Sequence, residues 1–336
     1  VSMGNNKKSI PKYDAEPLLK VSNLKQHFNI TLRTGWMTSK SGKVKAVDDI
    51  SFSIAPGETV GLVGESGCGK TSVGRSILHL NNPTSGKIDF TSIEMNKKSI
   101  AIVRKDMQVI FQDPFSSLNP RMTIGQILDE PLKVHKIIED KNKRKSRVDE
   151  LLVQVGLYSY MSERYPHELS GGQRQRVGIA RALSMEPKLI ICDEAVSALD
   201  VSVQAQIINL LEDLQNDLGI SYLFIAHDLA VVRHISHKVI VMYLGKIMEI
   251  ANEYDLYSNP QHPYTKALLD AAPVPDPEVE KNRKRIILKG ELPSPLNPPK
   301  GCVFSTRCSM YSAECSKAIP ELKEFKPNHF VSCIKV

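Results

Sequence analysis

Short runs of apolar residues alternate with helix-like segments through the middle of the chain. The runs Val60–Val63, Leu189–Cys192 and Ser221–Ala226 have the length of buried strands. Between the last two lies Val203–Leu218, where apolar residues recur at the spacing of an amphipathic helix. Strands that alternate with helices favour a parallel sheet, so we expect an α/β fold.

The segment before residue 90 has a different pattern. Leu18–Leu24 and Ile50–Ile54 are typical of strands, and the polar stretch Thr34–Lys43 between them predicts a loop or an insertion. Pro56-Gly57 and Pro83–Gly86 mark turns. Residues 115–183 are predicted to be mostly helical, because apolar positions recur at three- and four-residue spacing in three segments. These segments are Ile124–Val134, Arg147–Val155 and Arg174–Leu183.

Both ends of the chain lack this regular patterning. Residues 1–16 are polar and predict a disordered arm. After about residue 257 the composition changes, and the proline-rich stretch Pro260–Pro299 predicts an irregular linker. Four of the six cysteines follow it.

Composition restricts the classes of protein that are possible. The 336 residues are 41% hydrophobic and 24% charged, which is ordinary for a globular protein. No apolar run approaches the roughly 20 residues of a membrane helix, and no apolar segment follows the basic N-terminus as in a secretory signal. We therefore expect a cytosolic protein, in which disulfides are rare. The net charge of +7 permits an anionic partner. The basic runs Lys141–Arg147 and Asn282–Lys289 lack interleaved aromatic residues, which favours solvated surface over nucleic-acid or lipid binding.

A phosphate-binding motif follows the first buried strand. Residues Gly64–Thr71 read GESGCGKT and fit the pattern G-x-x-x-x-G-K-[ST] between a strand and a helix. Glycines allow backbone N–H groups to converge on a phosphate, and the helix N-terminus adds a positive dipole. Lys70 is predicted to contact the β- and γ-phosphates, and the Thr71 hydroxyl to bind Mg²⁺. The predicted nucleotide contacts here are Gly64, Glu65, Ser66, Gly67, Cys68, Gly69, Lys70, Thr71 and Ser72.

Acidic residues follow a second buried strand. Asp193 and Glu194 come directly after Leu189–Cys192, and His227 comes directly after Ser221–Ala226. Ligands of open parallel sheets bind beyond the carboxyl ends of the strands, so these side chains are expected to converge near the phosphate-binding motif. Asp193 is predicted to hold Mg²⁺ through water, and Glu194 to accept a proton from the attacking water.

The sequence LSGGQ forms a third motif. Ser170 is a candidate helix N-cap, and Gly171 and Gly172 leave the backbone open to a ligand. The helix expected after Gln173 directs its dipole toward an anion. A capped helix after a loop explains the same residues without any ligand.

Together these motifs resemble the nucleotide-binding subunit of an ATP-binding cassette (ABC) transporter. The resemblance covers residues 18 to about 255, and it implies that Phe28 stacks on adenine. It also implies that Gln112 senses Mg²⁺, and that His227 contacts the γ-phosphate. The segment Ser197–Asp200 matches the loop that crosses between two subunits. Ala195 departs from the proline that is usual in the family, which affects only the stiffness of the loop.

The fold implied by the resemblance is a RecA-like phosphate-loop core. It comprises a nucleotide-binding domain at 17–256, a helical subdomain inserted at about 113–183, and a C-terminal extension at 257–336. The extension, with Asn259–Thr265, is similar to that of oligopeptide and dipeptide importer ATPases. Lys25–Phe28 and Arg164–His167 resemble the F-type subunit of such importers.

Four cysteines in the extension form C-x5-C-x6-C-x17-C: Cys302, Cys308, Cys315 and Cys333. The C-x2-C pairs typical of zinc sites are missing, and four thiolates are the usual ligands of iron–sulfur clusters. The resemblance implies a [4Fe–4S] cluster, with zinc and the absence of any metal as alternatives. Cys68 and Cys192 are interpreted as small space-filling residues.

The resemblance implies a mechanism and a set of partners. Two ATPase subunits pair head to tail, and each site combines the phosphate loop of one with Ser170, Gly171, Gly172 and Gln173 of the other. The expected partners are a sister ATPase, two transmembrane permease subunits and an extracytoplasmic peptide-binding protein, with this chain at the cytoplasmic face of the membrane.

Two other functions compete with this interpretation. A soluble ATPase acting on DNA or ribosomes usually carries coiled coils, zinc fingers or two ATPase units, and this sequence has none, so no nucleic-acid partner is expected. A regulatory subunit without turnover is disfavoured because Lys70, Asp193, Glu194 and His227 are all present.

Overall fold

The computed structural model describes residues 11–33, 39–113, 117–271 and 290–336. The chain forms two compact units, each built from segments that are distant in the sequence. Of the described residues, 11–16, 55–58 and 96–225 belong to the first unit and the others to the second. Most of the predicted disordered arm, and the basic run Asn282–Lys289, lie outside the described residues.

Parallel strands and helices alternate in the first unit. Strands β6 (Met107–Ile110), β7 (Leu189–Asp193) and β8 (Ser221–Ile225) pair in parallel, with β7 in the middle. Helix α7 (Val201–Leu218) connects β7 to β8, and the short helix α2 (Ile100–Val103) precedes β6. The predicted parallel pairing of the two buried runs is confirmed.

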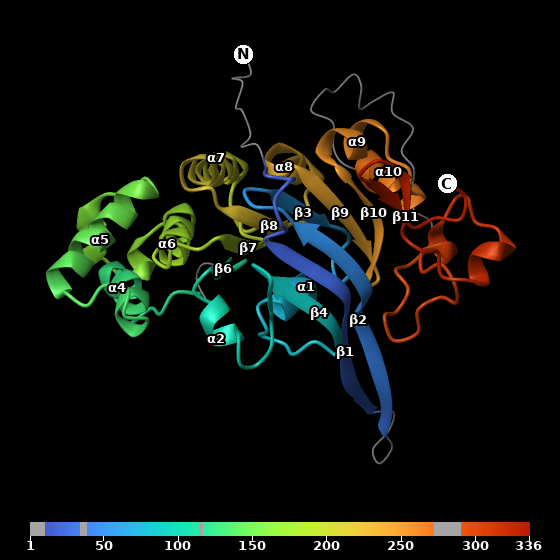
Figure 1. The fold of residues 1–336 in the computed structure, drawn as a ribbon, viewed down its shortest axis with the longest axis horizontal. Helices are drawn as coiled ribbons and strands as arrows, with labels where there is room; N and C mark the ends of the chain where they lie inside the picture. The colour runs from blue at the N-terminus through green and yellow to red at the C-terminus, as the bar shows by residue number, and fades with distance from the viewer. Residues whose placement is uncertain (1–10, 34–38, 114–116, 272–289) are drawn as a thin grey trace. The chain divides into compact units, whose positions relative to one another are not determined.

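A group of helices is inserted between β6 and β7 (Figure 1). It contains α4 (Ile124–Val134), α5 (Lys141–Gln154) and α6 (Gly171–Leu183), with the short helices η1 (Ser159–Glu163) and η2 (Pro166–Glu168). The bounds of α4 agree with the prediction, since the Thr123 side chain and Gln126 form a reciprocal capping box at its start. The other two helices begin earlier than predicted.

The basic run Lys141–Arg147 is the first half of α5. Most of it is exposed or half-exposed, as predicted for solvated surface, but Arg144 is buried. The Arg144 Nε donates to Asp129 Oδ1 at 2.6 Å, and Nη1 donates to the carbonyl of Glu139 at 2.7 Å. Arg144 therefore serves the packing of α4 against α5 and is not available to a ligand.

The second unit contains an antiparallel sheet in the order β2-β1-β4-β5. Its strands are β1 (Leu19–Arg33), β2 (Ser39–Ile54), β4 (Ser85–Phe90) and β5 (Ile93–Glu94). The prediction of a loop at Thr34–Lys43 is wrong for residues 39–43, while 34–38 lie outside the described residues. Lys43 and Gly42 pair with Asn29 and Ile30 on β1. Backbone hydrogen bonds between the two strands therefore extend β2 through residues whose sequence has no apolar alternation.

Further strands of the second unit run in the order β11-β12-β10-β9-β3. They are β3 (Thr59–Val63), β9 (Lys238–Tyr243), β10 (Lys246–Asn252), β11 (Lys323–Lys326) and β12 (His329–Val331). The helices of this unit are α1 (Lys70–Ile77), α8 (Leu229–Ile235), α9 (Glu253–Ser258) and α10 (Pro263–Ala271), with the single turns η3 (Ser305–Arg307) and η4 (Ala313–Ser316). Helix α10 corrects the prediction that Pro260–Pro299 is irregular throughout, because Pro263 stands in its first turn, where the missing N–H is harmless.

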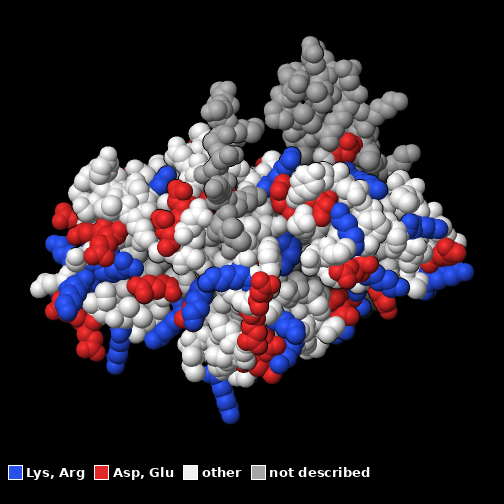
Figure 2. Space-filling model, turned by 45° about the horizontal axis from the view of Figure 1, so that its top comes forward, with Lys and Arg blue, Asp and Glu red and all other residues white. Residues whose placement is uncertain are grey.

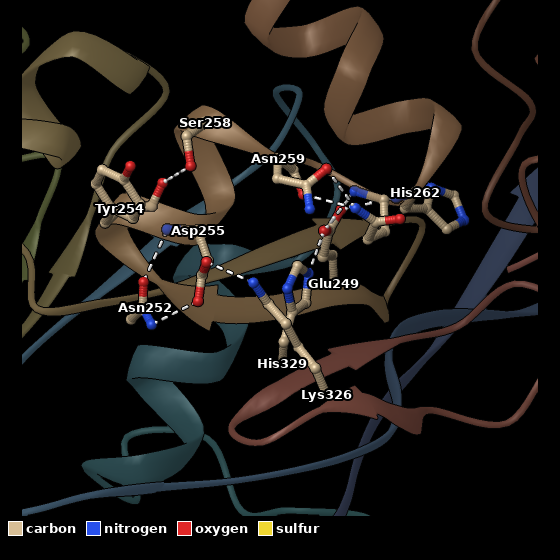
Figure 3. Close-up of polar contacts among 10 residues, drawn as sticks. Glu249, Asn252, Tyr254, Asp255, Ser258, Asn259, His262, Lys326 and His329 are labelled. Atoms are coloured by element: carbon tan, nitrogen blue, oxygen red, sulfur yellow. Dashed lines mark hydrogen bonds and ion pairs between the residues drawn. The ribbon is translucent and has the colours of Figure 1, made fainter.

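A buried carboxylate attaches the C-terminal strands to the rest of the second unit (Figure 3). Glu249 on β10 is fully buried, and its Oε1 lies 2.7 Å from Nε2 of His329 on β12. The same carboxylate accepts hydrogen bonds from the backbone N–H groups of Gln261 at 2.8 Å and His262 at 2.9 Å, just before α10. Nearby, Lys326 on β11 pairs with Asp255 on α9. The buried Glu249 carboxylate therefore connects three segments: β10, β12 and the residues just before α10.

Charged side chains of both signs cover the surface drawn in Figure 2, where basic and acidic groups lie beside one another. Ion pairs among the described residues include Arg147 with Glu186 and Lys188 with Asp106. Among the described residues, no helix has the length and apolarity needed to cross a membrane.

Candidate nucleotide-binding site

The phosphate loop, residues Gly64–Thr71, joins β3 to α1. Its backbone has positive φ angles at Gly64 (152°) and Gly69 (108°). A Cβ atom at Gly64 would lie 2.2 Å from the carbonyl oxygen of Met242, and one at Gly69 would lie 2.0 Å from that of Ala46. Both positions therefore require glycine, because the loop is pressed against neighbouring backbone.

Lys70 places a cation inside the phosphate loop. It is 4% exposed, and its Nζ donates to the carbonyl oxygens of Gly64 at 2.7 Å and Glu65 at 3.1 Å. Helix α1 begins at this residue and has no acidic residue in its first turn. A buried ammonium at a helix N-terminus is an environment that attracts an anion such as phosphate. Burial raises the pKa of the Cys68 thiol, although Lys70 acts in the opposite direction.

Phe28 and His227 lie in the same unit as the phosphate loop. Phe28 on β1 is half-exposed and pairs across to Val44 on β2, two residues before Ala46, which touches Gly69. His227 is exposed and follows Ala226, whose N–H donates to Leu62 at the end of β3. The contacts of Phe28 and His227 with a nucleotide stay predictions.

Glu194 is held in a constrained conformation in the first unit. Its φ angle is 51°, in the left-handed region that non-glycine residues rarely adopt. The backbone is fixed there because its N–H donates to Ile225 at 2.9 Å and its carbonyl accepts from the Ser197 N–H at 3.1 Å and hydroxyl at 3.0 Å. Such strain, of order 1–3 kcal/mol, persists where the surrounding structure over-determines it, often at functional sites.

The Glu194 carboxylate is paired with Gln112, another predicted site residue. Gln112 Nε2 donates to Glu194 Oε2 at 2.8 Å, across 82 positions of sequence. Asp193 is half-buried at the end of β7, immediately before it. The structure therefore brings together two predicted catalytic residues that are distant in the sequence, Gln112 and Glu194.

Ser170 caps α6, as the sequence predicted. Its hydroxyl accepts from the Gln173 N–H at 3.3 Å, and the Gln173 side chain accepts from the Ser170 N–H at 3.0 Å. A Cβ at Gly172 would lie 2.6 Å from Val203 Cγ1, so close packing against α7 already explains this glycine. A capped helix after a loop therefore explains these residues without a ligand. A role for Ser170, Gly171, Gly172 and Gln173 in the site of a second subunit stays a prediction.

The predicted site residues fall into two groups, one in each compact unit. The phosphate loop, Phe28 and His227 belong to the second unit, and the remaining predicted nucleotide residues to the first. The convergence of both groups on one nucleotide stays a prediction.

Two residues that contact the phosphate loop were not found from the sequence. The Tyr264 hydroxyl accepts a hydrogen bond from the Glu65 N–H at 3.0 Å, and Arg307 Nη1 lies 2.7 Å from Glu65 Oε2. Tyr264 belongs to the segment Asn259–Thr265 that carried the resemblance. No sequence pattern distinguishes Arg307 from the other arginines of the chain.

The four cysteines of the extension line one cavity with His262, Phe304, Pro320 and other residues. Burial raises the pKa of Cys302 to about 11, and the other three thiols add to this effect. Among the described residues, no group of three or more histidine, cysteine or acidic side chains has the arrangement of a ligand set for a single metal ion.

A buried strand, a glycine-rich turn and a helix that begins with a buried lysine define a phosphate-loop nucleotide-binding protein. Comparison with known protein families identifies which kind of phosphate-loop protein this chain is. Residues 47–197 match the family described as ABC transporter, and residues 248–315 match that described as oligopeptide/dipeptide transporter, C-terminal region.

Individual relatives extend the match over most of the chain. It is 54% identical over 322 residues to the oligopeptide transport ATP-binding protein AppF of Bacillus subtilis, covering 95% of this chain and 97% of that protein. Identity to OppF of Salmonella typhimurium is 52%, covering 95% and 96%. The chain belongs to the family of oligopeptide transport ATP-binding proteins of ABC transporters.

Solved structures agree with this assignment. The ATP-binding cassette MJ0796, in a dimeric post-hydrolysis state bound to ADP and Pi, matches with a TM-score of 0.60 and 27% identity. That match covers 70% of this chain and 98% of the other. CbiO1 of Clostridium perfringens, part of the transporter complex cbiONQ, matches with a TM-score of 0.62, 27% identity and coverage of 73% and 92%. The ABC nucleotide-binding fold expected from the sequence is confirmed.

Proposed function

We propose that this chain is the ATP-hydrolysing subunit of a transporter that imports oligopeptides or dipeptides, bound peripherally at the cytoplasmic face of the membrane. The observation that carries the substrate class is the match of residues 248–315 to the C-terminal region of oligopeptide/dipeptide transporters. The ABC family model matches only the segment 47–197, which transporters of many substrates share. The chain itself is an ABC ATPase.

In the proposed reaction, the phosphate loop and Lys70 bind the β- and γ-phosphates. Thr71 would bind Mg²⁺ directly and Asp193 would hold it through water, and the ion would neutralise charge on the phosphates. Glu194 takes the proton of the attacking water, and its hydrogen bond to Gln112 fixes the carboxylate in place. His227 contacts the γ-phosphate.

We further propose that the working unit is a heterodimer with a sister ATPase, joined to two permease subunits and supplied by an extracytoplasmic peptide-binding protein. The relative MJ0796 is a dimer in its solved structure. Ser170 is exposed and Gly171 next to it is half-exposed, so this segment is accessible to a second subunit. Domain boundaries at 17–256 and 257–336, with a helical subdomain at about 113–183, are part of the same proposal.

The cysteine-lined cavity supports a further proposal, in which Cys302, Cys308, Cys315 and Cys333 hold a [4Fe–4S] cluster. Four thiols meet in one cavity, which is the donor set that such clusters use. When bound, the cluster would supply a covalent cross-link between the segments that carry the cysteines.

Reconstitution tests the proposed function. The purified chain should hydrolyse ATP poorly alone, and its turnover should rise when it is assembled with the sister ATPase and permease in proteoliposomes. Peptide-loaded binding protein outside the vesicles should raise it further, and Lys70→Ala in this chain should abolish the rise. Full turnover from a strictly monomeric preparation would contradict the shared-site mechanism, and stimulation by DNA or ribosomes instead of peptide would contradict the transport role.

A further inference from the structure

Glu65 is held from two sides by the C-terminal part of the chain. Its backbone N–H donates to the hydroxyl of Tyr264 on α10, and its carboxylate pairs with Arg307 at the end of η3. The Arg307 side chain is 10% exposed and that of Glu65 is 26% exposed, so the pair is shielded from water. Charged hydrogen bonds in such surroundings are stronger than exposed ion pairs.

The ion pair between Glu65 and Arg307 affects the charge of the phosphate loop. The loop is built to attract phosphate, yet its second residue carries a negative charge. An unpaired carboxylate at this point would repel a bound triphosphate, and the Arg307 guanidinium neutralises it. Burial works against the charge on Arg307, but Glu65 and the hydroxyl of Tyr243 outweigh it and raise the pKa of Arg307, so the guanidinium stays charged.

Aromatic packing fixes the position of Arg307. Phe304, three residues before it, is 1% exposed and lies with its ring centroid 5.2 Å from Tyr264 and 5.3 Å from Tyr243. The rings of Tyr243 and Tyr264 are 4.7 Å apart. Phe304 also lines the cysteine-lined cavity. Phe304 therefore holds the segment that carries Arg307 against Tyr243 and Tyr264 on one side and against the cysteine-lined cavity of the extension on the other.

We propose that Arg307 is a positioning residue for nucleotide binding: it neutralises and holds Glu65, and through it the C-terminal extension sets the affinity of the phosphate loop for MgATP. This inference rests on the proposed function, in which the phosphate loop binds ATP. Arg307 acts through Glu65 and needs no contact with the nucleotide.

Binding of a fluorescent ATP analogue with Mg²⁺ to the purified full-length chain tests the inference. Arg307→Gln should weaken binding about tenfold, which corresponds to about 1.4 kcal/mol. Glu65→Gln alone is the reference for the double variant, because it removes the carboxylate that Arg307 neutralises while Arg307 itself is kept. The double variant Arg307→Gln/Glu65→Gln should bind like Glu65→Gln alone, and this rescue distinguishes a charge effect from lost packing.

Two further variants separate the possible outcomes. Lys326→Gln removes another ion pair of the extension, away from the phosphate loop, and should bind nucleotide like the wild type. Lys70→Ala should lose binding if the proposed function is right. Wild-type affinity in Arg307→Gln would overturn the role of Arg307 while leaving the proposed function intact. The same would follow if Arg307→Gln weakened binding as much in the Glu65→Gln background as in the wild type. Full binding by Lys70→Ala would instead overturn the proposed function.

Discussion

Replacing Glu249 by glutamine should destabilise the second unit far more than the conservative change suggests. The buried carboxylate accepts three hydrogen bonds, from the N–H groups of Gln261 and His262 and from His329 (Figure 3). A glutamine side chain offers one oxygen and one NH₂ group, so in either orientation its NH₂ faces at least one N–H donor. At least one buried hydrogen bond is then lost and its donor is left unpaired.

The magnitude follows from the charge and burial of this group. A hydrogen bond to a charged group contributes about 1.5–3 kcal/mol, and a buried donor left unsatisfied costs about 1–3 kcal/mol. We expect Glu249→Gln to lower the free energy of unfolding by about 3 kcal/mol. Urea unfolding of the full-length chain, followed by far-ultraviolet circular dichroism, measures this loss, and limited proteolysis should show earlier cleavage near β11 and β12.

A matched control is available on the next element. Glu253 on α9 pairs with Arg233, whose side chain is 63% exposed, so Glu253→Gln should cost less than about 1 kcal/mol. Equal unfolding curves for Glu249→Gln and Glu253→Gln would show that the buried carboxylate does not hold the C-terminal strands, and the reasoning would be refuted.

Three further predictions concern the proposed chemistry. Glu194→Gln should retain ATP binding but lose nearly all turnover in the reconstituted transporter, because the amide keeps the shape and removes the base; near-wild-type phosphate release would remove Glu194 from that role. Ser170→Arg, combined with a sister subunit inactivated at its own phosphate loop, should leave turnover at the remaining site, which is formed by this chain's phosphate loop; failure of that site would exclude action across the dimer. Protein purified without oxygen should contain about four iron and four acid-labile sulfide per chain, and Cys308→Ser should lose both while still binding ATP. Stoichiometric zinc without iron would contradict the cluster.

The features that the sequence predicted well are local. Gly64–Thr71 forms the expected loop because its glycines permit positive φ angles and because the strand, the turn and the helix follow one another directly in the sequence. The bounds of α4 were predicted correctly, since Thr123 and Gln126 complete a capping box within four residues. The buried runs at β7 and β8 are strongly apolar, so their type and parallel pairing followed from composition and order alone.

The features that were missed depend on partners far away in the chain. Residues 39–43 have no apolar alternation and become a strand only because β1 pairs with them. The strands β11 and β12 are only four and three residues long, and they are stabilised through β10 and the buried Glu249. Arg307 meets Glu65 across 242 positions of sequence, and a lone arginine carries no local sign of that contact. The sequence by itself determined the loop that can bind phosphate. Tertiary packing decided which C-terminal residues contact that loop, because a charge is buried and neutralised only by segments that the fold brings together.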